Sequence, residues 1–249
     1  MPSIHDLTIK MYCDGADLDS LLKMYRNPLI KGFTTNPTLM RKAGVDDYEE
    51  FGRALVQAIP DRPISLEVFA DELDEMEEQA LTLASWGKNV NVKIPVTNTK
   101  GEPTDAIVHS LSKRGVVVNV TAILSLEQVR RVVRALDAAT PAIVSVFAGR
   151  VADTGVDPVP LMAEALTILK DRPKAELLWA SPRELLNIFH ADQVGCHIIT
   201  VTTDLLAKLG LIGKNLEQFS LETVKMFYND ALAAGYSIVV GSESEVVSR

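Results

Sequence analysis

The sequence predicts an α/β protein, a single (β/α)8 TIM barrel with an extra C-terminal helix. Short β-branched runs alternate with longer amphipathic segments, and eight such runs follow one another without a linker between halves of the chain. The runs VVVNV and AIVSVF are almost continuously apolar, as in parallel strands covered on both faces. Eight strands favour a closed barrel over an open sheet. We therefore expect one domain over residues 1–249, with 214–249 as a C-terminal helical extension.

The predicted strands are short apolar or β-branched runs. They cover residues 8–13, 30–34, 63–69, 90–94, 116–120, 142–147, 176–179 and 197–201. The predicted helices include residues 72–84, 104–113, 126–136, 160–169, 183–193 and, after the last strand, 221–233. In 126–136 apolar residues recur at intervals of three and four, which is the helical period. Ser125 and Gln128 form a predicted capping box at its start.

Composition narrows the classes of partner and cofactor. Lys and Arg number 25 against 33 Asp and Glu, a formal net charge of -8, and no basic run argues for nucleic acid or an anionic membrane. No signal pattern begins the chain and no apolar run reaches about 18 residues, so we expect a soluble, cytoplasmic protein. Cys13, Cys196 and four scattered His residues predict neither disulfides nor a metal site, and no GxGxxG or P-loop motif occurs.

Polar residues lie within the predicted strands near their C-terminal ends or directly follow those ends, where the strands of a barrel converge on one pocket. They are Asp14, Thr34, Asn36, Glu67, Lys93, Asn119, Thr121, Ser145, Arg150, Ser181 and Arg183. Asn119 and Thr121 are two residues apart and so point to the same side of their strand. If that side is the interior, these groups share a cavity.

Lys93 lies within the apolar strand NVNVKIPV. Burial would disfavour its charged form and lower its pKa. A neutral amine can attack a ketone to form a Schiff base, and the protonated imine is an electron sink for carbon–carbon bond cleavage. The alternative is an edge or interface lysine whose stem packs while its head reaches water.

Two carboxylates fit the same chemistry. Glu67, in SLEVF, is costly to bury unless paired; it could hold a water near Thr121 and move protons, or form a salt bridge with Lys93. Asp14 could take the proton of a substrate hydroxyl, or serve as a helix cap. Asp17 offers another cap, which leaves Asp14 free for the first role.

Three residues near the ends of the sixth and seventh strands are typical of an anion site: Arg150, Ser181 and Arg183. Ser181 would stand just before a helix opening at Pro182. The alternative is surface arginines paired with Asp153 and Glu184. In the TTNP segment, likewise, Asn–Pro can be an ordinary turn start.

Seven windows together resemble the transaldolase family, which includes the fructose 6-phosphate aldolase-like proteins. They are MYCDG, GFTTNPTLM, SLEV, NVKIPVT, NVTAILS, SVFAGR and ASPR, in the family's order from residue 11 to about 183. Each is weak alone, but seven in order are a strong signal. The resemblance implies a barrel that forms a Schiff base between Lys93 and a ketose, without cofactor or metal. It also implies a homo-oligomer, a pentamer or decamer, with the C-terminal helix reaching a neighbour.

The resemblance implies a role for each site residue. Asp14 is the acid/base of carbon–carbon cleavage, and Glu67 and Thr121 position the catalytic water. Hydroxyls of the bound three-carbon unit are held by Asn36 and Asn119. The sugar phosphate, or another anionic sugar, is bound by Arg150, Ser181 and Arg183. The remaining substrate-binding residues are Thr34, Ser145 and Phe147.

Two positions favour a transferase over an aldolase. Aldolase members resemble one another in having Tyr and Gln where this chain has Phe147 and Glu67. Phe cannot donate a proton, so the three-carbon carbanion should wait for an aldehyde. The resemblance therefore implies transfer of dihydroxyacetone, in the pentose phosphate pathway, from sedoheptulose 7-phosphate or fructose 6-phosphate to glyceraldehyde 3-phosphate or erythrose 4-phosphate. Fructose 6-phosphate aldolase is the alternative.

Two departures from the family pattern concern the anion site. Trp179 stands where the family has a small residue and Pro182 where it has an aromatic one. An indole at the barrel mouth would narrow the pocket, which leaves another anionic ketose, such as 6-deoxy-6-sulfofructose, as an alternative substrate.

Two other classes of protein fit less well. A non-catalytic sugar-phosphate-binding protein needs no Schiff-base lysine, and this chain has Lys93 together with Asp14 and Glu67. A deoxyribose-phosphate-type aldolase needs a second lysine near the first, whereas Lys10 and Lys31 lie towards the starts of their strands.

Overall fold

The computed structural model describes residues 4–240, and the chain divides into two compact units. The larger, His5–Leu209, contains the barrel. The described part of the smaller is Ile4 with residues 210–240, and its main element is α11 (Leu216–Ala233). The larger unit positions the site.

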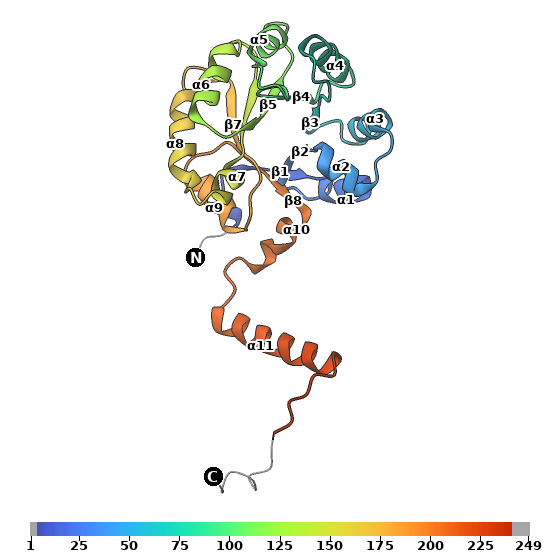
Figure 1. Ribbon diagram of the computed structural model, residues 1–249, viewed down its shortest axis with the longest axis vertical. Helices are drawn as coiled ribbons and strands as arrows, with labels where there is room; N and C mark the ends of the chain where they lie inside the picture. Colours follow the sequence, from blue (N-terminus) through green and yellow to red (C-terminus); the bar gives the residue numbers. More distant parts are fainter. Residues whose placement is uncertain (1–3, 241–249) are drawn as a thin grey trace. The chain divides into compact units, whose positions relative to one another are not determined.

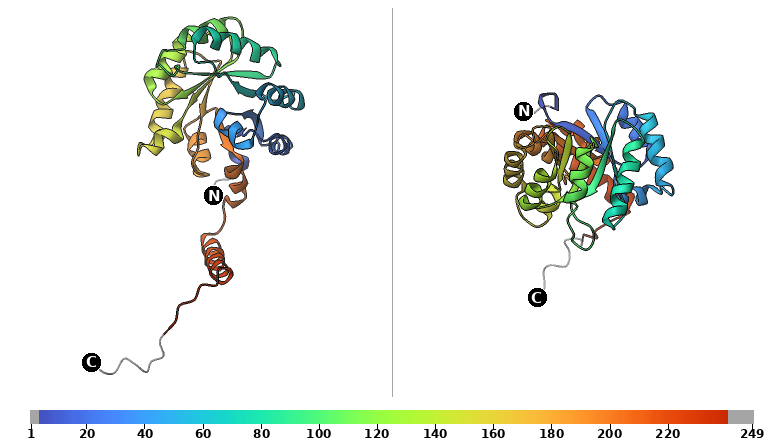
Figure 2. Two further views of the ribbon diagram at one scale, coloured as in Figure 1. Left: turned by 45° about the vertical axis from the view of Figure 1, so that its right-hand side comes forward. Right: turned by 90° about the horizontal axis from the view of Figure 1, so that it is seen from above.

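Eight strands close into one parallel barrel in chain order, with β1 paired to both β2 and β8. They are β1 (Lys10–Asp14), β2 (Ile30–Thr34), β3 (Ile64–Glu67), β4 (Val90–Pro95), β5 (Val118–Ile123), β6 (Ala142–Val146), β7 (Ala175–Trp179) and β8 (Ile198–Thr202). The predicted (β/α)8 barrel is thus confirmed, with every predicted strand present and its bounds moved by a few residues. Figures 1 and 2 show the strands at the centre of this unit and the helices around them.

The helices of the barrel unit lie outside the strands; α1 to α9 connect successive strands and α10 follows the last one (Figure 1). They are α1 (Leu18–Tyr25), α2 (Pro37–Ala43), α3 (Tyr48–Ala58), α4 (Leu73–Ser85), α5 (Asp105–Lys113), α6 (Leu126–Ala135), α7 (Ala148–Asp153), α8 (Pro158–Leu169), α9 (Leu186–Gln193) and α10 (Thr203–Leu206). Short 3-10 turns occur at η1 (Ile4–Asp6) and η2 (Ala207–Leu211).

Helix caps confirm one sequence prediction and bear on one sequence alternative. Ser125 and Gln128 form the predicted capping box at the start of α6, which ties down the N–H groups that a helix start leaves unpaired. Asp17 caps α1 by accepting the Ser20 N–H at 2.9 Å. Asp14 is therefore not needed as a cap and remains at the end of β1.

Alternation along the strands separates the outer core from the barrel interior. Leu66, Val92 and Ile94 have no exposed surface, and their positions alternate with inward-pointing Glu67 and Lys93. Outward apolar side chains face the helices, as expected of parallel strands covered on both faces.

An apolar cluster lies in the barrel next to the polar side chains of the cavity. Its buried members are Tyr12, Ile143, Leu178, Ala180 and Ile198. Gly32 makes room for the Tyr12 ring, because a Cβ at Gly32 would lie 2.6 Å from the ring's Cζ. Leu178 and Ala180 also line the cavity, so the cluster supplies part of its apolar wall.

The smaller unit is dominated by α11, whose first turn is capped by the Asn215 side chain. Apolar residues recur along α11 at helical spacing, at Leu221, Val224, Tyr228 and Leu232. The described residues of this unit offer no second long helix or strand to cover that stripe. Of the helices in residues 4–240, none combines the length and apolarity that crossing a membrane requires.

Candidate active site

A cavity of about 790 Å³ opens at the C-terminal ends of the barrel strands. All of the predicted site residues line it: Asp14, Thr34, Asn36, Glu67, Lys93, Asn119, Thr121, Ser145, Phe147, Arg150, Ser181 and Arg183. The strand ends thus bring side chains from distant parts of the sequence into one pocket. Within the described part of the chain, no cluster of three or more His, Cys, Asp or Glu side chains could hold a metal ion.

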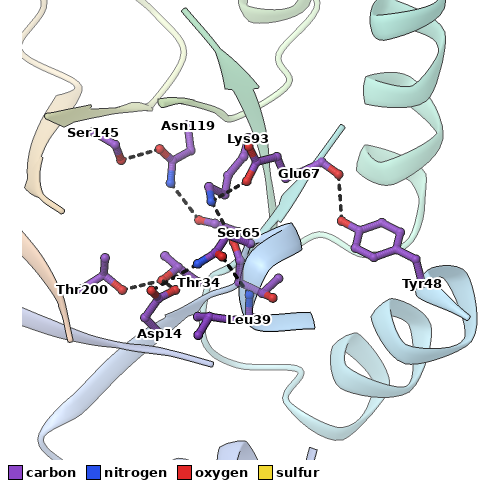
Figure 3. Close-up of polar contacts among 12 residues, drawn as sticks. Asp14, Thr34, Leu39, Tyr48, Ser65, Glu67, Lys93, Asn119, Ser145 and Thr200 are labelled. Atoms are coloured by element: carbon purple, nitrogen blue, oxygen red, sulfur yellow. Dashed lines mark hydrogen bonds and ion pairs between the residues drawn. The ribbon is translucent and has the colours of Figure 1, made fainter. Parts of the chain in front are cut away.

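Lys93 and Glu67 form an ion pair inside the barrel (Figure 3). They are register partners on β4 and β3, and Lys93 Nζ lies 2.8 Å from Glu67 Oε2. Nζ also donates to the carbonyl oxygen of Thr35 at 2.7 Å. Lys93 is 7% exposed, so its head does not reach bulk water as the alternative supposed. An amine this close to a carboxylate can pass it a proton.

Asp14 is held by two donors from the neighbouring strand and its following turn. Thr34 Oγ1 donates to Oδ1 of Asp14 at 2.8 Å, and Asn36 Nδ2 donates to Oδ2 at 3.4 Å. Asn36 is also the N-cap of α2, where its Oδ1 accepts the Leu39 N–H at 3.0 Å. That contact orients the Asn36 amide, so its NH2 group faces Asp14.

The environment of Asp14 raises the pKa of its carboxyl above the ordinary value. Burial is the largest cause, and the charge of Glu67 adds to it. The Lys93 ammonium and the hydrogen bonds from Thr34 and Asn36 act in the opposite direction. A carboxyl with a raised pKa suits a group that both takes and returns a proton.

Asn119 is fully buried between two serines. Its Oδ1 accepts from Ser145 Oγ at 2.6 Å, and its Nδ2 donates to Ser65 Oγ at 3.1 Å. Ser145 therefore points its hydroxyl proton at Asn119 and orients its amide. Sequence reasoning missed Ser65, although it stands two residues before Glu67 and so shares its inward face.

Thr200 is the second side chain that sequence reasoning missed. Its hydroxyl is hydrogen-bonded to that of Thr34, next to Asp14 (Figure 3). The predicted strand 197–201 contained Thr200, and its position two residues from Thr202, which also lines the cavity, was the available signal.

The two arginines of the predicted anion site differ in their contacts. The Arg150 guanidinium lies over the Phe147 ring, 5.2 Å from its centroid, and no carboxylate within the described residues forms an ion pair with it. Arg183 is paired with Asp153, with Nε donating to Oδ1 at 3.0 Å and Nη2 to Oδ2. Arg183 holds the pKa of Asp153 below its usual range. The surface-pair alternative is thus correct for Arg183, which lines the cavity as well.

The predicted helix start beside Ser181 is wrong. Ser181 has φ 57°, a left-handed conformation, and its carbonyl oxygen would lie 1.5 Å from a Cβ at Gly149, so only glycine permits this approach. The two N–H groups after Pro182 donate to Oδ1 of Asn187, at 2.7 and 3.2 Å. α9 therefore begins at Leu186, and no helix N-terminus faces the anion site.

Trp179 does not narrow the pocket. It has no exposed surface and does not line the cavity, whereas its neighbours Leu178 and Ala180 do. Strand alternation directs the indole outwards, toward the helices. The expectation that it reshapes the mouth is therefore wrong; Pro182, by contrast, lines the cavity.

Known proteins resemble this chain in both structure and sequence. 3-Hexulose-6-phosphate synthase from Salmonella typhimurium shares the fold, with a TM-score of 0.54 at 16% identity over 78% of this chain and 89% of that one. A probable transaldolase of Dehalococcoides mccartyi is 34% identical over 202 residues, 81% of this chain and 90% of the relative. Probable transaldolase 2 of Listeria monocytogenes is 35% identical over 215 residues, 85% and 94%. The sequence model of the transaldolase/fructose-6-phosphate aldolase family matches residues 11–238. The chain belongs to the transaldolase/fructose-6-phosphate aldolase family.

Proposed function

We propose that this protein is a transaldolase that transfers a dihydroxyacetone unit through a Schiff base on Lys93. The donor is sedoheptulose 7-phosphate or fructose 6-phosphate, and the acceptor is glyceraldehyde 3-phosphate or erythrose 4-phosphate. The same proposal places the reaction in the cytoplasm and in the pentose phosphate pathway. The observation that supports it most is the buried Nζ of Lys93 in the cavity, 2.8 Å from the Glu67 carboxylate.

Schiff-base formation begins with transfer of a proton from the Lys93 ammonium to Glu67. The free amine attacks the C2 carbonyl carbon of the ketose and forms a carbinolamine. Glu67 then returns a proton to the departing hydroxyl, directly or through a water held with Thr121, and water leaves as the iminium forms. The geometry supports this role because Glu67 is the carboxylate bonded to Nζ.

Carbon–carbon cleavage uses the carboxylate on the other side of the pocket. Asp14 takes the proton of the C4 hydroxyl, the C3–C4 bond breaks, and its electrons move to the iminium nitrogen to form an enamine. The aldose phosphate leaves. In the second half, the enamine carbon attacks the acceptor aldehyde and Asp14 returns the proton to the new hydroxyl. Hydrolysis of the iminium then frees the product and Lys93.

Transfer is favoured over release of dihydroxyacetone because of Phe147. Its ring lines the cavity and carries the Arg150 guanidinium over one face, but it has no proton to give to the enamine. The bound three-carbon unit therefore persists until an aldehyde arrives.

The anionic end of the sugar belongs at the rim, where Arg150, Ser181 and Arg183 line the cavity. A sulfonated ketose such as 6-deoxy-6-sulfofructose is an alternative substrate only if Trp179 reshapes the pocket. The Trp179 side chain, however, lies outside the cavity. Sugar phosphates are therefore the first choice of substrate.

The test is intact-protein mass spectrometry after borohydride reduction in the presence of fructose 6-phosphate, with and without glyceraldehyde 3-phosphate. We expect a three-carbon adduct on Lys93 that disappears when the acceptor is added before reduction. The Lys93→Ala variant is the matched control and should form no adduct. An unmodified wild-type chain under these conditions would refute the proposal for this donor.

A further inference from the structure

Thr200 connects the wall of the barrel to Asp14. It lies on β8, opposite Tyr12 in the pairing of β8 with β1, and its side chain is largely buried while lining the cavity. Its hydroxyl bonds that of Thr34, and Thr34 donates to Asp14 Oδ1 at 2.8 Å. Figure 3 shows Thr200 and Asp14 both next to Thr34.

The direction of donation along the hydrogen bonds between Thr200, Thr34 and Asp14 follows from counting protons. A threonine hydroxyl has one proton, and an ionised carboxylate can only accept. When Asp14 is ionised, the Thr34 proton is therefore committed to Asp14, and the Thr34 oxygen must accept its other bond from Thr200. Donation runs from Thr200 to Thr34 to Asp14. A hydroxyl that accepts one hydrogen bond donates the next more strongly.

Of the two hydrogen bonds to the Asp14 carboxylate, the one from the Thr34 hydroxyl is shorter, at 2.8 Å. The second donor, Asn36 Nδ2, is 3.4 Å from Oδ2, longer than the usual N–H···O hydrogen bond. Asn36 is itself fixed by its cap contact with Leu39 and cannot move closer without releasing that N–H. Thr34, and through it Thr200, therefore dominates the orientation of the carboxylate.

We propose that Thr200 is a positioning residue for Asp14: it directs the Thr34 proton to the carboxylate and so keeps Asp14 oriented and ready to take the substrate's hydroxyl proton. This inference rests on the proposed function, in which Asp14 is the acid/base. Thr200 acts through Thr34 and touches no reacting atom in this scheme.

Other charged groups also act on Asp14. Its pKa responds to the charges of Lys93 on β4 and Glu67 on β3. The remaining charged side chains that line the cavity are Lys42 from α2, Arg150 from α7, Arg183 from the segment after β7, Asp204 from α10 and Lys208 from η2. All of these charged residues are unchanged in Thr200 variants. A difference in pH profile between those variants is therefore due to the loss of the Thr200 hydroxyl.

The test compares Thr200→Val, which keeps the shape but loses the hydroxyl, with Thr200→Ser, which keeps the hydroxyl. The readout is the pH profile of kcat/KM for transfer from fructose 6-phosphate to glyceraldehyde 3-phosphate. Losing the bond should move the acidic limb of Thr200→Val up by about half to one pH unit and lower kcat about fivefold to tenfold, with KM nearly unchanged. Thr200→Ser should keep the wild-type limb.

Thr200→Ser is the matched control, because it keeps the hydroxyl that bonds Thr34 and leaves Thr202, whose side chain bonds Asp204, unchanged. Its acidic limb should stay at the wild-type pH. If Thr200→Val fails to fold, Thr200→Ala takes its place. A wild-type acidic limb in the valine or alanine variant, with the borohydride adduct on Lys93 still formed, would overturn this inference and leave the proposed function intact. Absence of the adduct in the wild-type enzyme would overturn both.

Discussion

Lys93 and Glu67 face each other across β4 and β3 in direct register, with Nζ 2.8 Å from Oε2 and both side chains mostly enclosed by the barrel. Taking two charges out of water costs free energy that their mutual attraction only partly returns. Replacing a buried ion pair by well-packed apolar side chains is often neutral or stabilising. The pair is therefore better explained by chemistry, since it gives an amine a proton acceptor inside the cavity.

The first prediction concerns that amine. Lys93→Ala should fold and lose turnover by more than about a thousandfold, because it removes the buried amine that lies beside Glu67 and forms the Schiff base in the proposed mechanism. The variant leaves Glu67 without its partner, so its melting temperature should fall below the wild-type value. Adding Glu67→Gln should restore part of that loss without restoring activity. Steady-state transfer assays and thermal melts followed by circular dichroism measure both. Normal turnover in Lys93→Ala would refute the mechanism.

The second prediction concerns the fate of the three-carbon enamine. Phe147→Tyr should increase release of free dihydroxyacetone from fructose 6-phosphate without an acceptor, because a phenol supplies a proton donor where the wild-type ring has none. The increase should be about tenfold or more over Phe147→Leu, the control for lost ring contacts with Arg150. An assay for dihydroxyacetone follows the release. Equal release from the two variants would show that residue 147 does not decide between transfer and cleavage.

Much of the barrel and its pocket was predictable because the signal repeats. Apolar strands of period two alternate with helical segments, and polar residues such as Lys93 and Asn119 stand out at strand ends. A closed barrel then brings these ends together whatever the connecting segments do. The family resemblance added roles to residues that the strand pattern had already singled out.

The sequence did not predict features of the site that depend on backbone conformation or on the direction of a side chain. The start of α9 depends on the left-handed Ser181 and the Asn187 cap, which no local periodicity reveals. The sequence predicts Trp179 at the mouth, but alternation along β7 directs its side chain outwards, away from the cavity. Thr200 and Ser65 are ordinary strand residues until the neighbouring strands are placed beside them, because their hydrogen-bond partners are distant in the sequence.

The third prediction is that ionisation of the buried Asp14 carboxyl lowers the stability of the folded protein. Burial raises the pKa of Asp14 in the folded protein, so the folded state binds its proton more tightly than the unfolded state. The ionised carboxyl therefore costs stability above the folded pKa, and that cost disappears as pH falls below the unfolded value. Asp14→Asn should melt higher than wild type at about pH 8, with the difference shrinking toward about pH 4, while losing about a hundredfold or more in transfer activity. Thermal melts across this range measure the difference, with Asp17→Asn as a control for a carboxylate that caps a helix. If the difference in melting temperature between Asp14→Asn and wild type did not change with pH, the raised pKa of Asp14 would be contradicted.

The fourth prediction separates the two arginines at the rim. Arg150 has no carboxylate partner in the part of the chain described by the structure, whereas Arg183 shares its guanidinium with Asp153. Arg150→Met should raise KM for fructose 6-phosphate by about tenfold to a hundredfold, and Arg183→Met by less, with kcat changing little in either. Inhibition by inorganic phosphate should weaken in the same order. A larger effect at Arg183 would mean that the Asp153 pair opens when the anion binds.

The last prediction concerns assembly, for which we propose a homo-oligomer, a pentamer or decamer, in which α11 packs against a neighbouring copy. Its apolar stripe at Leu221, Val224, Tyr228 and Leu232 has no second long element to cover it among the described residues of its own unit. Val224→Glu combined with Tyr228→Glu should therefore reduce the mass of the particle measured by light scattering after size exclusion. The control is Lys225→Glu, which lies beside the stripe and changes the net charge by the same two units. It should leave the mass of the particle unchanged. Because the barrel unit contains the whole cavity, the double variant should keep its Schiff-base adduct on Lys93. A monomeric wild-type protein would contradict this assembly and leave the chemistry of the barrel untouched.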